Sequence, residues 1–327
     1  MREELLQVLG EPLTGAPLEL RDARRVGATI EEGMLVSTQT GRAYPIVRGI
    51  PRFVDSSNYA TSFGLQWNTF RTVQIDSETA GAHSKQRFDA ETAWVADQLQ
   101  GKWVLDAGCG AGRFAEVAAA RGANLVALDM SSAVEAAKQT LTRFPNTDVV
   151  QGSVLEPPIR RGSMDFAYCI GVAQHTPAPR AVVREVVQTV KEGGEFCFSI
   201  YARRPWTKLN AKYLVRPLTK RLPKTVLLSA IERLMPFAFP VAERLFALPH
   251  VGRIAQFAIP IAVYPEAREG WGREQRFREA ILDTFDMLSP QFDGPMTWGE
   301  VQGVLREVGV RGFDFKSRVP INVVGVR

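Results

Sequence analysis

The sequence has few residues of the kinds that bind metals or form disulfides. Among its 327 residues are three cysteines and three histidines, and no two cysteines form a CxxC pair. Three cysteines cannot build a disulfide framework, and a structural zinc site of the usual kind needs paired Cys or His ligands. Since unpaired cysteines are usual in reducing compartments, we expect a cytoplasmic location.

Long uncharged apolar stretches are also absent. No run approaches the roughly 18 apolar residues of a membrane-spanning helix. The N-terminal segment MREELLQVLGEP lacks the basic start and apolar centre of a secretory signal. We therefore expect neither a signal sequence nor a membrane span. With 45% hydrophobic and 23% charged residues, the chain has the balance of a globular protein, and its length suggests about two domains.

The first hundred residues fall into two regions. Residues 1–60 contain short strand-like segments separated by glycine and proline, which predicts a small β module. Residues 61–100 are expected to form a mainly helical linker, in which Trp94, Val95 and Leu99 have helical spacing.

Strand-like and helix-like segments alternate from residue 102. Five strand-like segments lie within residues 101–201, and a helix followed by two more strands is predicted at 297–327. This alternation predicts an α/β fold, with helices on both faces of a doubly wound, mostly parallel sheet of seven strands. We assign residues 101–201 and 265–327 to this domain, and expect its last strand to pair antiparallel.

Residues 202–264 interrupt the α/β pattern with a basic insertion. It contains eleven Lys or Arg residues against two Glu, a net charge of +9, whereas the whole chain carries +5. Seven prolines divide the segment, so we expect several short amphipathic helices, with SAIERLMPF and VAERLFAL as the best examples. Three roles fit: a lid over an apolar pocket, a patch that contacts a membrane surface, or a nucleic-acid-binding surface. Aromatic residues are sparse between the basic ones, which makes nucleic acid the least favoured.

A glycine-rich motif follows the first strand of the α/β region. The segment VLDAGCGAGRF places Asp106, Gly108, Gly110 and Gly112 where the strand ends and a helix begins. Glycine lets a ligand lie against the backbone, and ligands of open α/β sheets bind at the carboxyl ends of the strands. The motif is GxGxG rather than the GxGxxG of dinucleotide-binding proteins. The carboxylate of Asp106 suits an ammonium group, as in the amino acid part of S-adenosylmethionine, better than a pyrophosphate.

An acidic residue also ends the second strand of this region. Asp129 stands 23 residues after Asp106, at the end of NLVALD. A carboxylate at this position can accept hydrogen bonds from ribose hydroxyls. The two acids and the glycines together favour a cofactor site over an ordinary strand–helix turn.

Residues 102–201, with the closing segment at 297–327, resemble the class I S-adenosylmethionine-dependent methyltransferases, and most of all those of quinone and natural-product biosynthesis. The resemblance implies that Asp106 and the three glycines contact the methionine part of S-adenosylmethionine, and that Asp129 contacts its ribose. It also implies cofactor contacts beside the following strands, at Met130, Ser153, Val154 and Ile170. Ser153 stands where the family normally has an Asp that binds the adenine amino group, and a hydroxyl accepts that bond more weakly.

The segment MDFAYCIGVAQHTPAPR resembles the fourth-strand motif of the same enzymes, which usually ends in His-His-Thr-Pro. Gln174 replaces the first histidine, and His175 is the histidine that remains. An imidazole accepts a proton near neutral pH, so His175 is our candidate general base if the acceptor must lose a proton. The alternative is a structural histidine that caps the following helix.

The linker segment SNYATSFGLQWNTFRTVQIDS resembles a segment that folds over the cofactor in related enzymes. By this resemblance Gln66, Trp67 and Arg87 are candidates for binding the cofactor's carboxylate or for lining the substrate entrance. The alternatives are core packing for Trp67 and surface exposure for Arg87.

Residues 1–60 resemble the zinc-ribbon modules that accompany some methyltransferases, on the segments EPLTGAPLEL and GMLVSTQTGRAYPIVRGIPRFV. The four metal-binding cysteines of such a module would fall at Glu11, Thr14, Ser37 and Thr40. None of the four is a cysteine, so we predict a metal-free module that serves packing or substrate contact.

These features predict an S-adenosylmethionine-dependent methyltransferase that acts on a small or lipophilic biosynthetic intermediate, with oxygen favoured over carbon or nitrogen as the methylated atom. Two alternatives stay open. The basic charge and the ribbon-like N-terminus would also suit an RNA methyltransferase, and Ser153 and Gln174 would permit a relative that binds the cofactor without catalysis. The expected partner is a small acceptor molecule, with nucleic acid less favoured and membrane-surface contact through residues 202–264 left open.

Overall fold

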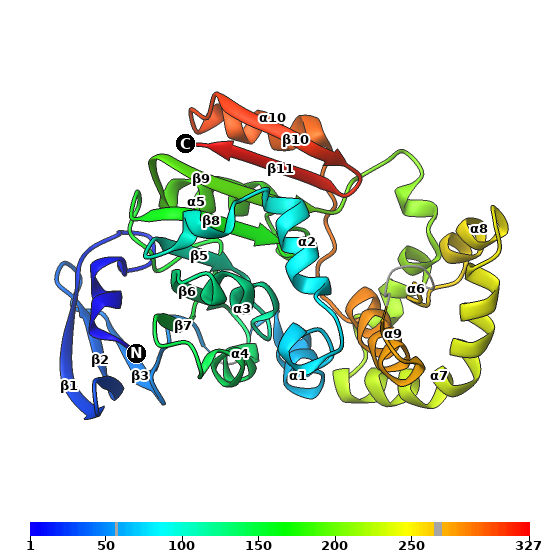
Figure 1. Cartoon of the computed structure of the whole chain (residues 1–327), viewed down its shortest axis with the longest axis horizontal. Helices are drawn as coiled ribbons and strands as arrows, with labels where there is room; N and C mark the ends of the chain where they lie inside the picture. The colour runs from blue at the N-terminus through cyan, green and yellow to red at the C-terminus, as the bar shows by residue number, and fades with distance from the viewer. Residues whose placement is uncertain (56–57, 265–269) are drawn as a thin grey trace.

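The computed structural model describes residues 1–55, 58–264 and 270–327. The protein has three parts: a small N-terminal β-sheet, a seven-stranded sheet covered by helices, and a group of helices beyond the ends of the parallel strands (Figure 1). The helices beyond the strands are α6 (Ala211–Thr219), α7 (Lys224–Phe246), α8 (Val251–Ala258) and α9 (Arg273–Leu288), and we call them the lid.

The N-terminal part forms the small β module that the sequence predicts. After a short 3-10 helix, η1 (Glu3–Gln7), four strands pair antiparallel in chain order. They are β1 (Leu18–Val26), β2 (Thr29–Ser37), β3 (Ala43–Val47) and β4 (Ile50–Pro51). Ile30, Leu35 and Ile46 are buried in a core that includes one face of the large sheet. The module is therefore packed onto the α/β domain.

The four positions at which the resemblance places metal-binding cysteines lie together in this module. Glu11 is 3% exposed, and its carboxylate accepts hydrogen bonds from the hydroxyls of Thr14 (2.6 Å), Ser37 (2.9 Å) and Thr40 (2.5 Å). Tyr44 donates a longer bond of 3.4 Å. Burial alone would raise the pKa of Glu11, but these hydrogen bonds outweigh burial and lower the pKa. We call these five residues the Glu11 cluster.

Replacing Glu11 with alanine should destabilise the fold by about 1–3 kcal/mol, because the hydroxyls of the Glu11 cluster would lose their common acceptor. The folded pKa of Glu11 lies below its ordinary value. Its stabilisation is therefore present at neutral pH and is lost as pH falls through the folded pKa. Urea unfolding at neutral and acid pH measures the difference between Glu11→Ala and wild type, which should shrink in acid. Glu19→Ala is the matched control, because Glu19 forms an exposed pair with Arg21. Equal stability of Glu11→Ala and wild type at neutral pH would contradict a structural role for the cluster.

The large sheet has the strand order β10-β11-β9-β8-β5-β6-β7. Its strands are β5 (Trp103–Ala107), β6 (Asn124–Asp129), β7 (Thr147–Gln151), β8 (Met164–Ile170), β9 (Val190–Ile200), β10 (Gly312–Arg318) and β11 (Ile321–Val326). Strands β5 to β9 pair parallel, and β11 pairs antiparallel with β9 and β10. The predicted seven-stranded, mostly parallel sheet with an antiparallel last strand is confirmed. The chain order reverses between β5 and β8, and open α/β sheets bind ligands at such a reversal.

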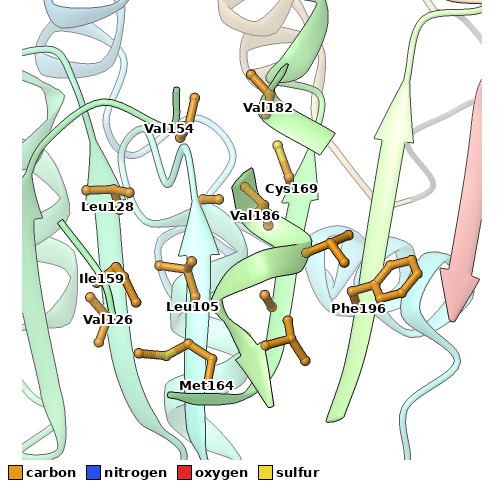
Figure 2. Close-up of a cluster of buried hydrophobic side chains, with 14 of the residues drawn as sticks. Leu105, Val126, Leu128, Val154, Ile159, Met164, Cys169, Val182, Val186 and Phe196 are labelled. Carbon is orange, nitrogen blue, oxygen red and sulfur yellow. The ribbon is translucent and has the colours of Figure 1, made fainter. Parts of the chain in front are cut away.

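Helices cover both faces of the large sheet. One face carries α2 (His83–Thr92), α3 (Arg113–Ala120) and α4 (Ala133–Leu141), and the other carries α5 (Pro179–Thr189), α10 (Trp298–Glu307) and the small sheet. Alternate residues of each strand enter the two cores, because successive strand side chains point to opposite faces. Leu105 and Cys169 enter the core beneath α5, where Figure 2 shows them with Val182 and Val186 of that helix.

The linker is helical in part, and one prediction about it is wrong. It contains α1 (Thr61–Thr69), η2 (Asp76–Glu78), α2 and η3 (Ala96–Leu99). Trp94, Val95 and Leu99 do not share a helix, because α2 ends at Thr92 and Ala93 adopts a φ of 57°. The hydroxyl of Thr92 accepts a hydrogen bond from the N–H of Trp94, which fixes this turn. Trp94 and Leu99 are buried, whereas Val95 is exposed.

The lid has its own core. It consists of η5 (Thr207–Leu209), α6 (Ala211–Thr219), α7 (Lys224–Phe246), α8 (Val251–Ala258) and α9 (Arg273–Leu288). Buried side chains of α7, α8 and α9 form a third cluster, which also includes Phe70 and Val73 of the linker. Because α9 packs in this cluster, we include it in the lid, although its residues lie in the segment 265–327 that we assigned to the α/β domain.

Helix α7 differs from two expectations. Pro236 and Pro240 lie inside it, so SAIERLMPF and VAERLFAL belong largely to one helix of 23 residues rather than to two short ones. A proline within a helix removes a backbone hydrogen bond, and here the packing of one side of α7 in the lid core supports the helix. By length and composition α7 could also cross a membrane, with a mean hydropathy of 1.4 over 18 residues, of which 33% are buried. The core helix of a soluble protein can pass the same test, so the expectation that no segment spans a membrane stays a prediction.

Candidate functional site

The carboxyl ends of the parallel strands form an edge that faces the lid (Figure 1). We call it the strand edge. Residues 108–112, which we call the glycine loop, follow β5, Asp129 ends β6, and Val172 follows β8. Since β5 and β8 are the neighbours at which the chain order reverses, the glycine loop and Val172 meet where a ligand is expected.

The glycine loop has a backbone that other residues rarely adopt. Gly108, Gly110 and Gly112 have φ values of 94°, 54° and 89°. A Cβ on Gly108 would lie 2.4 Å from a methyl carbon of Val172, and one on Gly110 would lie 2.8 Å from the indole nitrogen of Trp67. The N–H of Gly108 donates to the carbonyl of Leu128 at 2.8 Å, which ties the loop to β6. Both positions therefore require glycine.

Asp106 is a buried carboxylate with an unused hydrogen-bonding atom. It is 3% exposed, and its Oδ2 has no hydrogen-bond partner within the described residues. Burial raises the pKa of Asp106 to about 8, with a further contribution from the charge of Asp129 and an opposing one from the Tyr168 hydroxyl. A buried carboxylate with an unpaired oxygen destabilises the fold. A cationic ligand at this position would remove that cost.

Asp129 connects the glycine loop to the turn after β6. One carboxylate oxygen accepts a hydrogen bond from the N–H of Gly110 at 3.0 Å, and the other accepts from the N–H and hydroxyl of Ser131 at 2.8 and 2.7 Å. Burial raises the pKa of Asp129, and the bonds from Ser131 and Gly110 oppose this shift. The next residue, Met130, has a backbone carbonyl that accepts a bond from the linker residue Asn58 at 3.1 Å.

The remaining residues predicted on the third and fourth strands lie at the same edge. Ser153 follows β7, and its hydroxyl oxygen accepts a hydrogen bond from the N–H of Leu155 at 3.1 Å. Val154 and Ile170 are buried, one in each core of the sheet. A ligand at the strand edge would therefore meet chiefly the backbone of these two residues.

Helix α1 covers the strand edge. Trp67 lies against Gly110, and a Cβ on Gly64 would lie 2.3 Å from the hydroxyl of Ser132, which follows β6. Gln66 is fully buried and donates a hydrogen bond to Asp286 of α9 at 3.1 Å, while its side-chain oxygen has no partner within the described residues. The helix thus links the glycine loop to the lid.

Arg87 lies elsewhere. It is on α2, pairs with Glu91 at 2.8 Å, and has its guanidinium over the Phe114 ring at 5.4 Å. Helix α2 covers one face of the sheet, where the backbone carbonyl of Glu91 accepts a hydrogen bond from Cys197 in β9. The structure therefore brings Gln66 and Trp67, but not Arg87, to the strand edge, and Arg87 matches the surface alternative.

His175 lies in the short helix η4 (Ala173–His175) directly after β8. It is 6% exposed, and its Nδ1 is 3.3 Å from the backbone carbonyl of Phe292. A carbonyl can only accept, so this hydrogen bond requires a proton on Nδ1. In the neutral ring Nε2 is then unprotonated and can accept a proton.

Aromatic side chains from separate segments surround His175. The ring centroids of Phe63 and Tyr201 lie 5.3 and 5.5 Å from that of His175, both in edge-on contacts. Tyr59 packs edge-on against Phe292, with centroids 5.3 Å apart. Burial, with a contribution from Asp129, raises the pKa of Tyr59 to about 12, so this tyrosine stays neutral. Tyr201 is 37% exposed.

Tyr59, Tyr201 and Phe292 are not among the site residues predicted from the sequence. Tyr201 directly follows β9, so its position at the carboxyl end of a predicted strand is a signal that could have found it. Tyr59 belongs to the linker segment that resembles a cofactor cover. Phe292 lies between α9 of the lid and α10 of the α/β domain. Its position depends on tertiary packing, which a local sequence pattern cannot predict.

Residues 105–198 match the methyltransferase domain family. They run from β5 into β9 and include the glycine loop, Asp129 and His175. This segment is a methyltransferase domain, and S-adenosylmethionine is the cofactor of such domains.

Curated relatives match a similar part of the chain. The ubiquinone biosynthesis O-methyltransferase of Erwinia tasmaniensis is 38% identical over 133 residues, which cover 38% of this chain and 55% of the relative. The enzyme of that name from Escherichia coli is 37% identical over 132 residues, with the same coverage. The chain thus spans about half the length of the curated relatives it matches. Among solved structures, an O-methyltransferase family protein of Burkholderia thailandensis is 12% identical with a TM-score of 0.42, covering 75% of this chain and 56% of that one.

Proposed function

We propose that the protein transfers a methyl group from S-adenosylmethionine to an oxygen atom of a small biosynthetic intermediate. The observation that carries this proposal is the buried carboxylate of Asp106, whose Oδ2 lacks a partner within the described residues, beside a loop that requires glycine. The names of the O-methyltransferase relatives support oxygen as the methylated atom.

The residues of the strand edge fit S-adenosylmethionine. Asp106 would bind its ammonium group, and the backbone of the glycine loop would lie along its amino acid part. Asp129 would accept hydrogen bonds from the ribose hydroxyls, with Met130, Ser153, Val154 and Ile170 around the adenine. When bound, this cofactor supplies a methyl group on a sulfonium, which is reactive toward nucleophiles without covalent help from the protein.

The side chains around His175 would bind and orient the acceptor. Phe63, Tyr201 and Tyr59 offer ring edges and faces that suit a flat aromatic acceptor. His175 would take the proton of the acceptor hydroxyl on Nε2, because its Nδ1 is held by the Phe292 carbonyl. Positioning of the acceptor supplies much of the remaining rate enhancement.

Product analysis with methyl-labelled S-adenosylmethionine tests the proposal. The acceptors would be phenols, ortho-diphenols, small primary amines and purified RNA, and mass spectrometry would locate the label. We expect labelled methyl ethers of the phenolic acceptors. Label confined to RNA would favour the RNA methyltransferase alternative, and cofactor binding without any methylated product would favour a non-catalytic relative.

A further inference from the structure

Helix α7 has a second apolar face that nothing in the described residues covers. Val226, Leu234, Phe237 and Val241 are 54%, 57%, 77% and 64% exposed. With 3.6 residues per turn, these four positions fall within about 80° of the helix circumference. They form one continuous row, which we call the α7 stripe. Ile231 and other residues on a different side of α7 pack in the lid core.

Neighbouring helices of the lid add to the exposed apolar surface. Leu214 and Leu218 are one turn apart on α6 and are 73% and 68% exposed, and Ile254 of α8 is 70% exposed. Of the twenty large hydrophobic side chains that are exposed in the described part of the chain, twelve lie between residues 202 and 264. That concentration marks a contact surface, because exposed apolar residues are otherwise scattered.

The same helices carry unpaired positive charge. Arg233 and Arg244 lie beside the α7 stripe, are exposed, and form no ion pair within the described residues. Of the two acidic residues of α7, Glu243 is turned toward α9, where it pairs with Arg276, and Glu232 is exposed but lies about 120° around the helix from the nearest residue of the α7 stripe. The exposed charge next to the stripe is therefore positive.

We propose that the lid docks on the surface of an anionic lipid bilayer, with the α7 stripe inserted at the headgroup level and the flanking arginines on lipid phosphates. A helix with one apolar row and basic flanks is the kind that lies in a membrane interface. Helix α7 lies along the surface rather than spanning the bilayer, because its other side is part of the lid core. A second copy of the chain would fit the stripe less well, since two surfaces of the same positive charge would repel. The proposal does not depend on which acceptor is methylated.

Vesicle flotation of the full chain tests this docking. We expect binding to mixed vesicles of phosphatidylcholine and phosphatidylglycerol, weak binding to phosphatidylcholine alone, and loss of binding at high salt. Leu234→Ser/Phe237→Ser/Val241→Ser and Arg233→Glu/Arg244→Glu should each reduce the affinity for anionic vesicles at least about tenfold. Since all five side chains are exposed, we expect both variants to melt like wild type.

Val26→Ser/Val95→Ser is the matched control, because these valines are 60% and 64% exposed outside the lid. It should bind vesicles as wild type does. Unchanged vesicle binding by both lid variants, or equal binding of wild type to neutral and anionic vesicles, would overturn the proposal. So would sedimentation showing a dimer that the stripe variant dissociates, or RNA binding in place of vesicle binding.

Discussion

Asp106→Asn is expected to weaken the binding of S-adenosylmethionine roughly tenfold to a hundredfold, the effect of losing a hydrogen bond to a charged group, about 1.5–3 kcal/mol. Asparagine keeps the size and the acceptor oxygen of Asp106 but not the charge that would pair with an ammonium group. In the ligand-free protein, the same substitution should raise stability at alkaline pH. The wild-type carboxylate is buried, with one oxygen unpartnered within the described residues.

The stability that Asp106→Asn gains over wild type should increase with pH. The folded pKa of Asp106, about 8, lies above its ordinary value of 3.8, so the folded protein holds a proton on it that the unfolded chain releases between these values. The wild type should therefore lose stability as pH rises through that window, and Asp106→Asn should lose less. Urea unfolding at mildly acid and alkaline pH measures this difference.

Asp148→Asn is the contrasting control. Asp148 is also 3% exposed, but it pairs with Arg2 at 2.9 Å. Its replacement removes the negative charge that pairs with the Arg2 guanidinium, so it should lower stability and leave the affinity for the cofactor unchanged. Loss of stability in both variants, with cofactor binding intact in both, would contradict the role given to Asp106.

His175→Gln is expected to lower kcat by roughly 10²–10⁴ while the affinity for S-adenosylmethionine stays within about twofold of wild type. A glutamine amide can still donate to the Phe292 carbonyl, so the local fold should persist, but it cannot take up a proton. The dependence of kcat on pH should differ from that of wild type, because the glutamine side chain has no group that takes up a proton. Steady-state rates across pH measure the effect.

His250→Gln serves as the control for this variant. His250 is exposed at the start of α8 in the lid and should leave the rate and its pH profile unchanged. A His175→Gln enzyme with the pH profile of wild type would remove His175 as the base and leave it as a packing residue between Phe63 and Tyr201.

The order of strands and helices along the chain was enough to predict which residues meet at the strand edge. Alternating strands and helices make a parallel sheet, and a parallel sheet brings the ends of its strands together. Asp106, the glycine loop and Asp129 therefore had to lie near one another once the strands were identified, and the structure brings them together.

The lid could not be predicted in the same way. Proline weakens a helix locally, so Pro236 and Pro240 predicted short helices, yet packing in the lid core supports one long α7. The bond from Gln66 to Asp286 joins residues 220 positions apart, and the Phe292 carbonyl reaches His175 across 117. Contacts of this range depend on how the lid packs on the sheet. The spacing of residues along the sequence therefore does not predict these two contacts.

In the N-terminal module, the resemblance predicted which positions lie together but not how their side chains interact. The resemblance identified Glu11, Thr14, Ser37 and Thr40 as equivalent positions, and these side chains do meet. It did not predict that one carboxylate would accept hydrogen bonds from the other three. That arrangement follows from chemistry, because a single acidic group among hydroxyls is their natural acceptor.

Calorimetric titration of the wild-type protein with S-adenosylmethionine near neutral pH, in buffers of different ionisation enthalpy, tests whether the Asp106 carboxylate binds the ammonium group of this cofactor. Because the Asp106 carboxyl has a pKa of about 8 without ligand and must be charged to bind an ammonium group, binding should release a proton. We expect one molecule of S-adenosylmethionine bound per chain, with a heat of binding that changes with the buffer. Absence of binding, or binding whose heat is the same in every buffer and in Asp106→Asn, would contradict it.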